Sequence, residues 1–136
     1  MKYYIDACIW RDYFENRSDN FRPLGEWAFK LISSILRNKE FIVISDVLED
    51  ELKDSSSEKQ LNDIFLLIPE QLVIRVKASD DQFVDARMLS RSLKTPFKDT
   101  LHAVISRDNG CIMVTRDKHF IELCEITVVK KPEDLI

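Results

Sequence analysis

The chain has 136 residues, of which 45% are hydrophobic and 32% are charged, a composition typical of a soluble globular protein and not of a disordered segment. Its net charge of −4 excludes a surface that is basic all over, so nucleic-acid binding would need a local basic patch. The sequence holds only two glycines, Gly25 and Gly110, which excludes the phosphate-binding loops that need closely spaced glycines.

The cysteines and the length of the apolar runs indicate in which cellular compartment the protein is found. The three cysteines, Cys8, Cys111 and Cys124, are widely spaced and odd in number, which favours reduced thiols over a disulfide framework. The first residues lack the pattern of a signal peptide, and the apolar stretches are too short to span a bilayer. We therefore expect a cytoplasmic protein with no membrane segment.

The first half of the chain predicts two short buried strands, each followed by helices. The strands are rich in β-branched and aromatic residues, and the helices repeat apolar residues at helical spacing. Ser45 is placed to cap the helix that follows the second strand. In chain order we predict a strand over 2–5, a helix through Ile9, Tyr13 and Phe14, a helix from Pro23 to Leu36, a strand over 41–45, a helix over 46–54, and a helix through Leu61, Ile64, Phe65 and Leu67 that the serines at 55–57 cap and Pro69 ends.

The second half continues the alternation of strands and helices. Ser79 with Gln82 is typical of a capping box at a helix start, and Asn109-Gly110 is typical of a helix end. In chain order we predict a strand over 72–76, a helix from Ser79 through Leu93, a helix from Thr95-Pro96 to Asn109-Gly110, a strand over 111–115, a short helix over 119–123 and a strand over 126–130.

These patterns together predict the fold class. The strands are apolar throughout, as expected where helices cover both faces of a sheet. We therefore predict a three-layer α/β/α sandwich with a mainly parallel sheet of about five strands. The sequence has no internal repeat or linker, so we expect a single domain over residues 1–136.

Acidic residues follow the predicted strands at positions that matter for function. Asp6 comes directly after the first strand, and Asp117 lies two residues beyond Thr115 at the end of the fourth. Glu51 lies on the helix that leaves the second strand, and Asp99 lies in the first turn of the helix that leads into the fourth. Sites in open parallel sheets form outside the carboxyl ends of the strands, so these acids are site candidates. Taken singly, Asp6 and Asp117 could instead be helix caps and Asp99 a partner of the helix dipole. Glu51 could be one more solvated acid in an acidic run.

Three segments that carry these acids resemble a known family. The stretches "YIDACIW", "SDVLEDELKD" and "FKDTLHAVISRDNGCIMVTRDKHF" are similar to the PIN-domain ribonucleases, and in particular to the VapC-type toxins of toxin–antitoxin pairs. The resemblance covers almost the whole chain and implies a PIN-like fold. The family carries a Glu-Leu pair on its third helix, and Glu51-Leu52 matches this pair better than Glu49 does. The chain departs from the family at Ala7-Cys8, where members often carry Thr or Ser and then Asn.

The resemblance implies a metal-dependent ribonuclease. Four crowded carboxylates repel one another unless a cation lies among them, and all-oxygen ligands suit Mg²⁺ or Mn²⁺. Such a cation activates water for attack on a phosphodiester. The resemblance makes Asp6, Asp99 and Asp117 metal ligands, and makes Glu51 a ligand or the group that positions the water. All four are the predicted catalytic residues.

Other polar residues near these acids have weaker assignments. Ser45 and Thr115 are candidate hydrogen-bond donors behind the metal ligands, although each could simply cap a strand end. His102 lies three residues after Asp99, and we favour a packed structural role for it over substrate contact. We expect His119 to be exposed.

A spaced set of cations predicts contacts with RNA. The basic residues of "ARMLSRSLKTPFK" recur every three or four positions and lead towards Asp99, and two more cations flank Asp117. A solvated helix face would give the same pattern. The candidates are Arg87, Arg91, Lys94, Lys98 and Arg116, with Lys118 beside the last.

The family resemblance also implies partners: an RNA substrate, a cognate antitoxin and a second copy of the chain in a homodimer. Trp10, Phe14 and Trp27 would suit an apolar dimer contact, or an ordinary core. Two alternatives to a toxin remain open, namely an RNA-processing PIN nuclease with no antitoxin and a PIN-like module that binds RNA or protein without cleaving. A haloacid-dehalogenase-type phosphatase is excluded because it needs a second acid where Cys8 stands.

Overall fold

The sheet has five strands, all parallel, in a computed structural model that describes residues 1–55 and 57–136. The strands lie in the order β3-β2-β1-β4-β5, and every adjacent pair is parallel. Their bounds are β1 Lys2–Ile5, β2 Phe41–Ser45, β3 Val73–Val76, β4 Ile112–Val114 and β5 Val128–Lys130. The predicted α/β class is confirmed, and the sheet is parallel throughout rather than mainly so.

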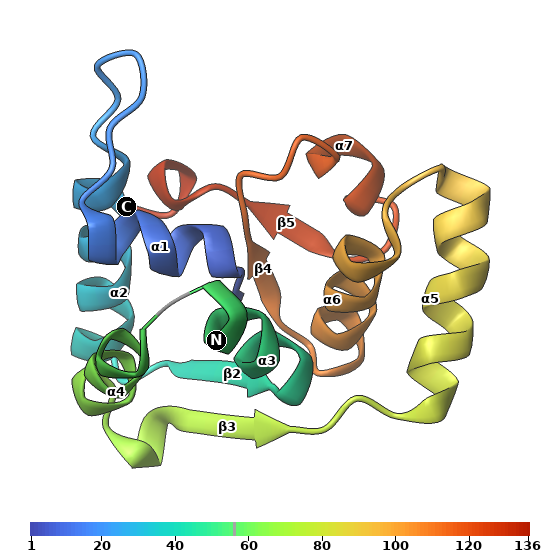
Figure 1. Cartoon of the computed structure of the whole chain (residues 1–136), viewed down its shortest axis with the longest axis horizontal. Coiled ribbons are helices and arrows are strands. Elements are labelled where there is room, and N and C mark those ends of the chain that lie inside the picture. The colour runs from blue at the N-terminus through green and yellow to red at the C-terminus, as the bar shows by residue number, and fades with distance from the viewer. Residues whose placement is uncertain (56) are drawn as a thin grey trace.

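Helices flank this sheet in two groups, as Figure 1 shows. Crossovers between parallel strands are right-handed, so the direction of a connection along the sheet decides which face its helices cover. Connections that run from β1 towards β3 place their helices on one face, and connections that run from β3 towards β5 place theirs on the other. The first group is α1 Ala7–Glu15, α2 Leu24–Arg37, α3 Asp46–Ser55 and α4 Glu58–Leu67; the second is α5 Asp80–Leu93, α6 Phe97–Asp108 and α7 Phe120–Leu123, with short 3₁₀ turns η1 Glu70–Leu72 and η2 Pro132–Asp134. No helix in the described part of the chain is long and apolar enough to cross a bilayer.

Most predicted element ends are confirmed by their caps. Ser57 with Gln60, and Ser79 with Gln82, form complete capping boxes at the starts of α4 and α5. Leu72, predicted as strand, belongs to η1, and β5 begins at Val128 rather than at residue 126. Among the predicted residues of the fourth helix and its cap, Ser56 and the side chains of Ser55, Ile64 and Phe65 lie outside the described residues.

The core is built on the three central strands. Tyr4, Ile42 and Val114 are fully buried, because helices cover the sheet on both faces. Trp10 of α1 is also fully buried, and its indole N–H donates to the Ile5 carbonyl at 3.1 Å. Of the two roles weighed for Trp10, the core role is therefore confirmed, and Trp10 has no surface for a partner.

Each glycine occupies a position that disfavours a side chain, Gly25 through lack of space and Gly110 through its backbone conformation. A Cβ on Gly25 would lie 2.5 Å from the Cα of Asn16, so this glycine allows the start of α2 to pack against the end of α1. Gly110 has φ +65° directly after α6, a conformation in which L residues are strained.

Candidate active site

Asp6 stands at the carboxyl edge of the sheet, between β1 and α1. Its Oδ1 accepts the Ala7 N–H at 2.8 Å and so caps α1, while its Oδ2 accepts the Thr115 hydroxyl at 2.8 Å. Its side chain is almost wholly buried. The pairing of β1 with β4 makes this contact possible, because it brings Asp6 beside the segment that leaves β4. Asp6 therefore caps a helix and also presents a carboxylate at the sheet edge.

Thr115 connects Asp6 to Asp117. Its Oγ1 accepts the Asp117 N–H at 3.1 Å while its hydroxyl proton goes to Asp6. Asp117 in turn accepts the His119 N–H at 2.7 Å, which closes the turn before α7. Our expectation that His119 is exposed is wrong: this turn leaves it partly buried.

Cys8 contacts the same pair of residues. Its thiol donates to Asp6 Oδ2 across 3.6 Å and lies 3.7 Å from Thr115 Oγ1. Burial, with a smaller effect from Asp6, raises the pKa of this thiol to about 12, so it stays protonated. The departure at Ala7-Cys8 therefore still leaves a weak donor beside Asp6, with sulfur in place of an amide or hydroxyl.

Glu51 reaches the site from α3. Its Oε2 lies 2.7 Å from His102 Nε2, and its Oε1 lies 3.7 Å from Arg11 Nη2. The hydrogen bond with His102 lowers the pKa of Glu51, so this carboxylate is ionised. Glu49 extends elsewhere and pairs with Arg75 at 2.6 Å. The position of Glu51 agrees with the sequence match, which preferred it to Glu49.

His102 is held by a chain of buried hydroxyl groups. Its Nδ1 lies 2.6 Å from the Tyr4 hydroxyl, which lies 2.7 Å from Ser45 Oγ. Ser45 Oγ also accepts the Leu48 N–H at 3.0 Å and so caps α3 as predicted. Among the described residues, the hydrogen bonds of Ser45 lead to Glu51 through Tyr4 and His102.

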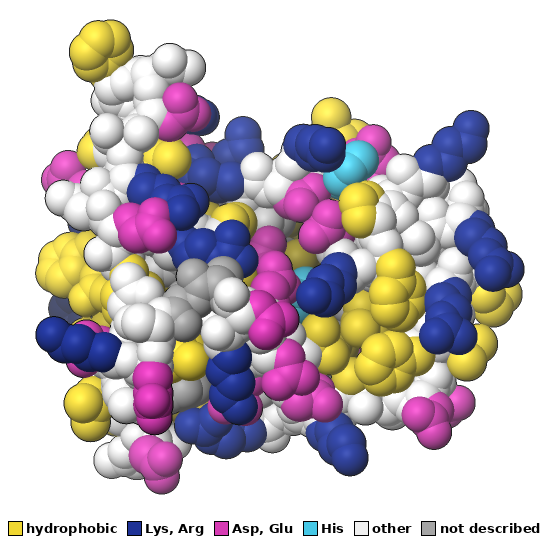
Figure 2. All heavy atoms as spheres, viewed as in Figure 1, with side chains coloured by type: hydrophobic (Ala, Val, Ile, Leu, Met, Phe, Trp, Pro, Cys, Tyr) yellow, Lys and Arg dark blue, Asp and Glu magenta, His cyan; other side chains and the backbone are white. Residues whose placement is uncertain are grey.

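Asp99 lies in the first turn of α6, close to Asp117 and Asp6. Burial, the neighbouring Asp117 carboxylate with a hydrogen bond to it and, to a smaller extent, Asp6 together raise the pKa of Asp99 to about 7. Near neutral pH, then, Asp99 is partly protonated. Figure 2 shows acidic side chains gathered along the middle of this face, where the surface is hollowed.

The donor atoms of Asp6, Glu51 and His102 all lie within 4.8 Å of one another. This set fits a divalent cation, because it supplies two carboxylate groups and one imidazole nitrogen in a largely buried place. Sequence reasoning expected Asp6 and Glu51 here and favoured a packing role for His102 over contact with substrate. The available signal was its spacing of three from Asp99, which puts both on one side of a helix.

The predicted RNA-binding cations divide into two groups. Those of α5 and the turn into α6 are exposed, and Lys98 is close enough to Glu51 to lower its pKa. Arg116 differs: its guanidinium pairs with Asp12 at 3.6 Å and Glu133 at 2.7 Å and lies over the Trp27 ring. Arg116 thus joins α1, α2 and η2 internally. The exposed cations are Arg87, Arg91, Lys94 and Lys98.

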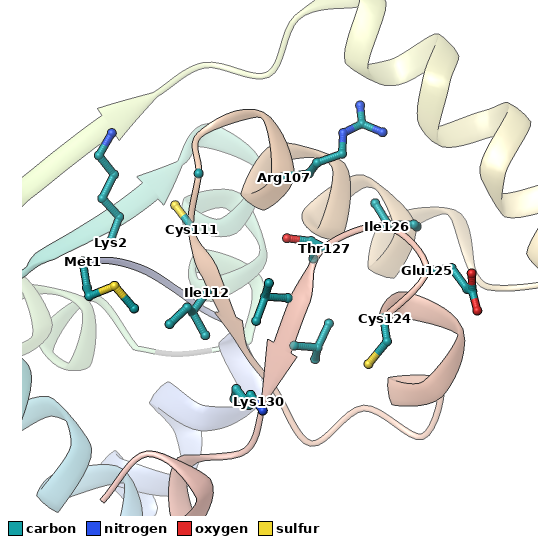
Figure 3. A pocket seen from close by; sticks show the side chains of 13 residues that line it. Met1, Lys2, Arg107, Cys111, Ile112, Cys124, Glu125, Ile126, Thr127 and Lys130 are labelled. Atoms are coloured by element: carbon teal, nitrogen blue, oxygen red, sulfur yellow. The ribbon is translucent and has the colours of Figure 1, made fainter.

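A groove of about 940 Å³ lies away from the acids, at the amino ends of β1, β4 and β5. Figure 3 shows Lys2, Cys111 and Thr127 among the side chains that line it. None of the four predicted catalytic acids lines it. The chemistry of this groove therefore has no part in the candidate active site.

No family model and no curated protein matches the sequence, whereas solved structures match the fold over nearly the whole chain. VapBC2 from Rickettsia felis, bound to a DNA fragment from their promoter, gives a TM-score of 0.65 at 19% identity, over 96% of this chain and 98% of that chain. A toxin–antitoxin complex from Klebsiella pneumoniae gives a TM-score of 0.69 at 15% identity, over 95% of this chain and 96% of that chain. FitAcB from Neisseria gonorrhoeae gives 0.62 at 13% identity, over 98% and 99%.

The chain has a PIN-like fold. Identities of 12–19% show the fold alone, so the activity has to be argued from the side chains of this chain.

Proposed function

We propose that this protein is a metal-dependent endoribonuclease that hydrolyses RNA phosphodiester bonds, and that it is the toxin of a toxin–antitoxin pair. The observation that carries the proposal is the meeting of four acids at one edge of the sheet. Asp6, Glu51, Asp99 and Asp117 come from four different segments, yet hydrogen bonds or mutual pKa effects connect them.

A divalent cation, Mg²⁺ or Mn²⁺, fits this edge on the chemistry of its donors. Burial raises the pKa of Asp99, and the Asp117 and Asp6 carboxylates add to this effect, as happens where acids lie close together without a counter-charge. Asp6, Asp99 and Asp117 would hold the cation, with Glu51 as ligand or as positioner of the attacking water. When bound, the cation supplies an activated water and offsets charge on the scissile phosphate.

The protein groups act around that centre by orientation and proton placement. His102 fixes the Glu51 carboxylate by its 2.7 Å hydrogen bond, and Thr115 fixes Asp6. Glu51, ionised and partly exposed, is placed to accept a hydrogen bond from the attacking water.

The exposed cations beside the acids are proposed to contact the RNA backbone. Arg87, Arg91, Lys94 and Lys98 are exposed on α5 and at the start of α6. Figure 2 shows basic side chains along the outer edge of this face, where α5 lies, with hydrophobic side chains between this edge and the acidic centre. Basic groups beside an acidic centre hold phosphates while the acids keep the metal.

The toxin role and the partners follow from the neighbours in fold. One matched structure is described as a toxin–antitoxin complex, and two others as VapBC2 and FitAB bound to DNA fragments, which supports the proposal of a cognate antitoxin for this chain. We also propose that it acts in the cytoplasm. A homodimer is also proposed: Phe29 of α2 is half exposed, and its ring stacks on Tyr13 of α1 at 6.2 Å. Phe14 belongs to the same aromatic surface.

The direct test is cleavage of a mixed-sequence RNA by the purified protein in Mg²⁺ or Mn²⁺, with EDTA as the metal-free arm. We expect endonucleolytic products that vanish in EDTA and return when Mn²⁺ is restored. Products that persist in EDTA would contradict the metal mechanism. Absence of products in every arm, with substrates that include structured and unstructured RNA, would favour the binding-module alternative.

The basic residues predict a salt-dependent affinity for RNA. Arg91→Ala and Lys94→Ala are each expected to weaken RNA binding and to reduce the slope of log K against log salt by about 0.7, because each removes one phosphate contact with a single strand. Lys30→Ala is the matched control, since Lys30 pairs with Glu26 on α2 and takes no part in the proposed contact. Equal slopes for all three variants and the parent would count against α5 as the RNA contact.

A further inference from the structure

His102 is a buried imidazole with both ring nitrogens in contact with polar groups of the site. Its side chain is 1% exposed, its Nδ1 lies 2.6 Å from the Tyr4 hydroxyl, and its Nε2 lies 2.7 Å from Glu51 Oε2. Nε2 is thus directed at the carboxylates and not at the core. We propose that His102 binds the divalent cation through Nε2, together with Asp6 and Glu51, and gives the site a preference for Mn²⁺ over Mg²⁺. This inference rests on the metal dependence of the proposed function.

The spacing of the donors suits one shared ion. Ligand atoms at right angles around an ion, with bonds of about 2.1 Å, lie about 3 Å apart. The Glu51–His102 separation of 2.7 Å needs only a small adjustment to reach that value. Asp6 offers an oxygen within 4.8 Å of both, which places all three donors around one shared position.

The hydrogen-bond chain allows Nε2 to lose its proton while Nδ1, the Tyr4 hydroxyl and Ser45 Oγ stay hydrogen-bonded to one another. Without a cation, Nε2–H donates to Glu51, and Nδ1 accepts from the Tyr4 hydroxyl. With a cation, the proton sits on Nδ1 and is donated to the Tyr4 oxygen, and the Tyr4 hydroxyl turns to Ser45 Oγ, 2.7 Å away. In this second arrangement a lone pair on Nε2 faces an ionised Glu51, and a cation between them removes the repulsion.

Tyr4 then acts as the outer partner that metal-binding histidines require. A ligating imidazole commonly donates its second N–H to a fixed oxygen, which sets the tautomer and the orientation of the ring. The Tyr4 hydroxyl is such an oxygen, buried on β1 and held by Ser45, which also caps α3. The same chain therefore ties the imidazole to the strand that leads into Asp6.

The donor chemistry determines which ion is favoured. Carboxylate oxygens are suitable ligands for both Mg²⁺ and Mn²⁺. An imidazole nitrogen, in contrast, binds transition-metal ions in preference to Mg²⁺. A set of two carboxylates and one imidazole therefore shifts selectivity towards Mn²⁺ without excluding Mg²⁺.

The test is pulsed electron paramagnetic resonance of Mn²⁺ bound to the full-length protein, free of RNA. We expect electron spin-echo modulation from a directly coordinated ¹⁴N. The chain has two histidines, so His119→Gln is the matched control and should keep the modulation, whereas His102→Gln should lose it. Protein labelled with ¹⁵N only in histidine should lose the ¹⁴N modulation with no change of sequence, which keeps the test valid where a variant of buried His102 fails to fold.

Calorimetry gives a second readout on the same proteins. His102→Gln is expected to lower Mn²⁺ affinity by about tenfold or more, and to lower Mg²⁺ affinity by clearly less. Mn²⁺ that binds without ¹⁴N modulation would overturn the inference and leave the proposed nuclease intact, with His102 only orienting Glu51. Failure of Mn²⁺ to bind at all would overturn both the inference and the metal dependence, while RNA cleavage in EDTA would separately decide the activity.

Discussion

Asp99→Asn is expected to abolish the proposed metal-dependent RNA cleavage, with a fall in rate of about a thousandfold or more, because it removes one of the negative charges proposed to hold the cation. Asn keeps the size of the side chain, so the packing of the first turn of α6 is preserved. The measurement is the single-turnover cleavage rate in saturating Mn²⁺. Asp19→Asn, on the exposed turn where Asp19 pairs with Arg22, is the matched acid-to-amide control and should cleave at the parent rate.

The same variant has an opposite effect on stability without metal. The pKa of Asp99 is raised from 3.8 to about 7 in the folded chain, so the folded state binds a proton that the unfolded state has already released. The free energy of unfolding of the metal-free parent therefore falls as pH rises from about 4 to about 8. Asn carries no charge, so the free energy of unfolding of Asp99→Asn should exceed that of the parent by about 1–2 kcal/mol at pH 8. This figure is reduced to allow for the partial exposure of the site.

Urea unfolding in EDTA at several pH values measures this directly. We expect the difference between variant and parent to grow as pH rises from 5 to 8. Parallel stability curves across that range would show that Asp99 is not crowded by Asp117 and Asp6, and would remove the electrostatic support for a cation there.

Trp10→Ala is expected to cost about 3–5 kcal/mol of stability, a large share of the total for a domain of this size. The indole is fully buried between α1 and the sheet, and it loses both its packing and its bond to the Ile5 carbonyl. Because that carbonyl directly precedes Asp6, the metal affinity of the remaining folded protein should fall as well. Thermal and urea unfolding give the first effect, and Mn²⁺ calorimetry gives the second.

Trp27→Ala is the matched control for this prediction. Trp27 is only partly buried, and its ring lies 5.4 Å from the Arg116 guanidinium, so we expect a loss of about 1–2 kcal/mol and no change in metal affinity. Equal losses for the two tryptophan variants would contradict the assignment of Trp10 to the core.

The elements of the fold were predictable because their signals are local. Apolar strands such as "FIVIS" indicate burial on both faces, and the Ser79–Gln82 capping box marks the start of α5 within four residues. The placement of Asp6 directly after a buried strand was likewise enough to predict an acid at the sheet edge. These features depend on neighbours in the sequence, so one sequence suffices to read them.

The contacts within the site were decided only by the tertiary structure. The strand order puts β4 beside β1, which brings Thr115 to Asp6 across 109 residues of sequence. His102 meets Glu51 across 51 residues, and no local pattern indicated that its ring would turn towards the acids rather than serve only as packing.

For Arg116, the tertiary structure shows internal contacts that the sequence did not indicate. Its place beside Asp117 suggested an RNA contact, but the fold packs it against Asp12, Glu133 and the Trp27 ring. By itself the sequence determined the α/β class, the element order and the acids that follow the strands, because periodicity and capping act over a few residues. The tertiary structure alone decided which of these polar groups face one another, because hydrogen bonds and charge pairs between distant segments depend on strand order and helix packing.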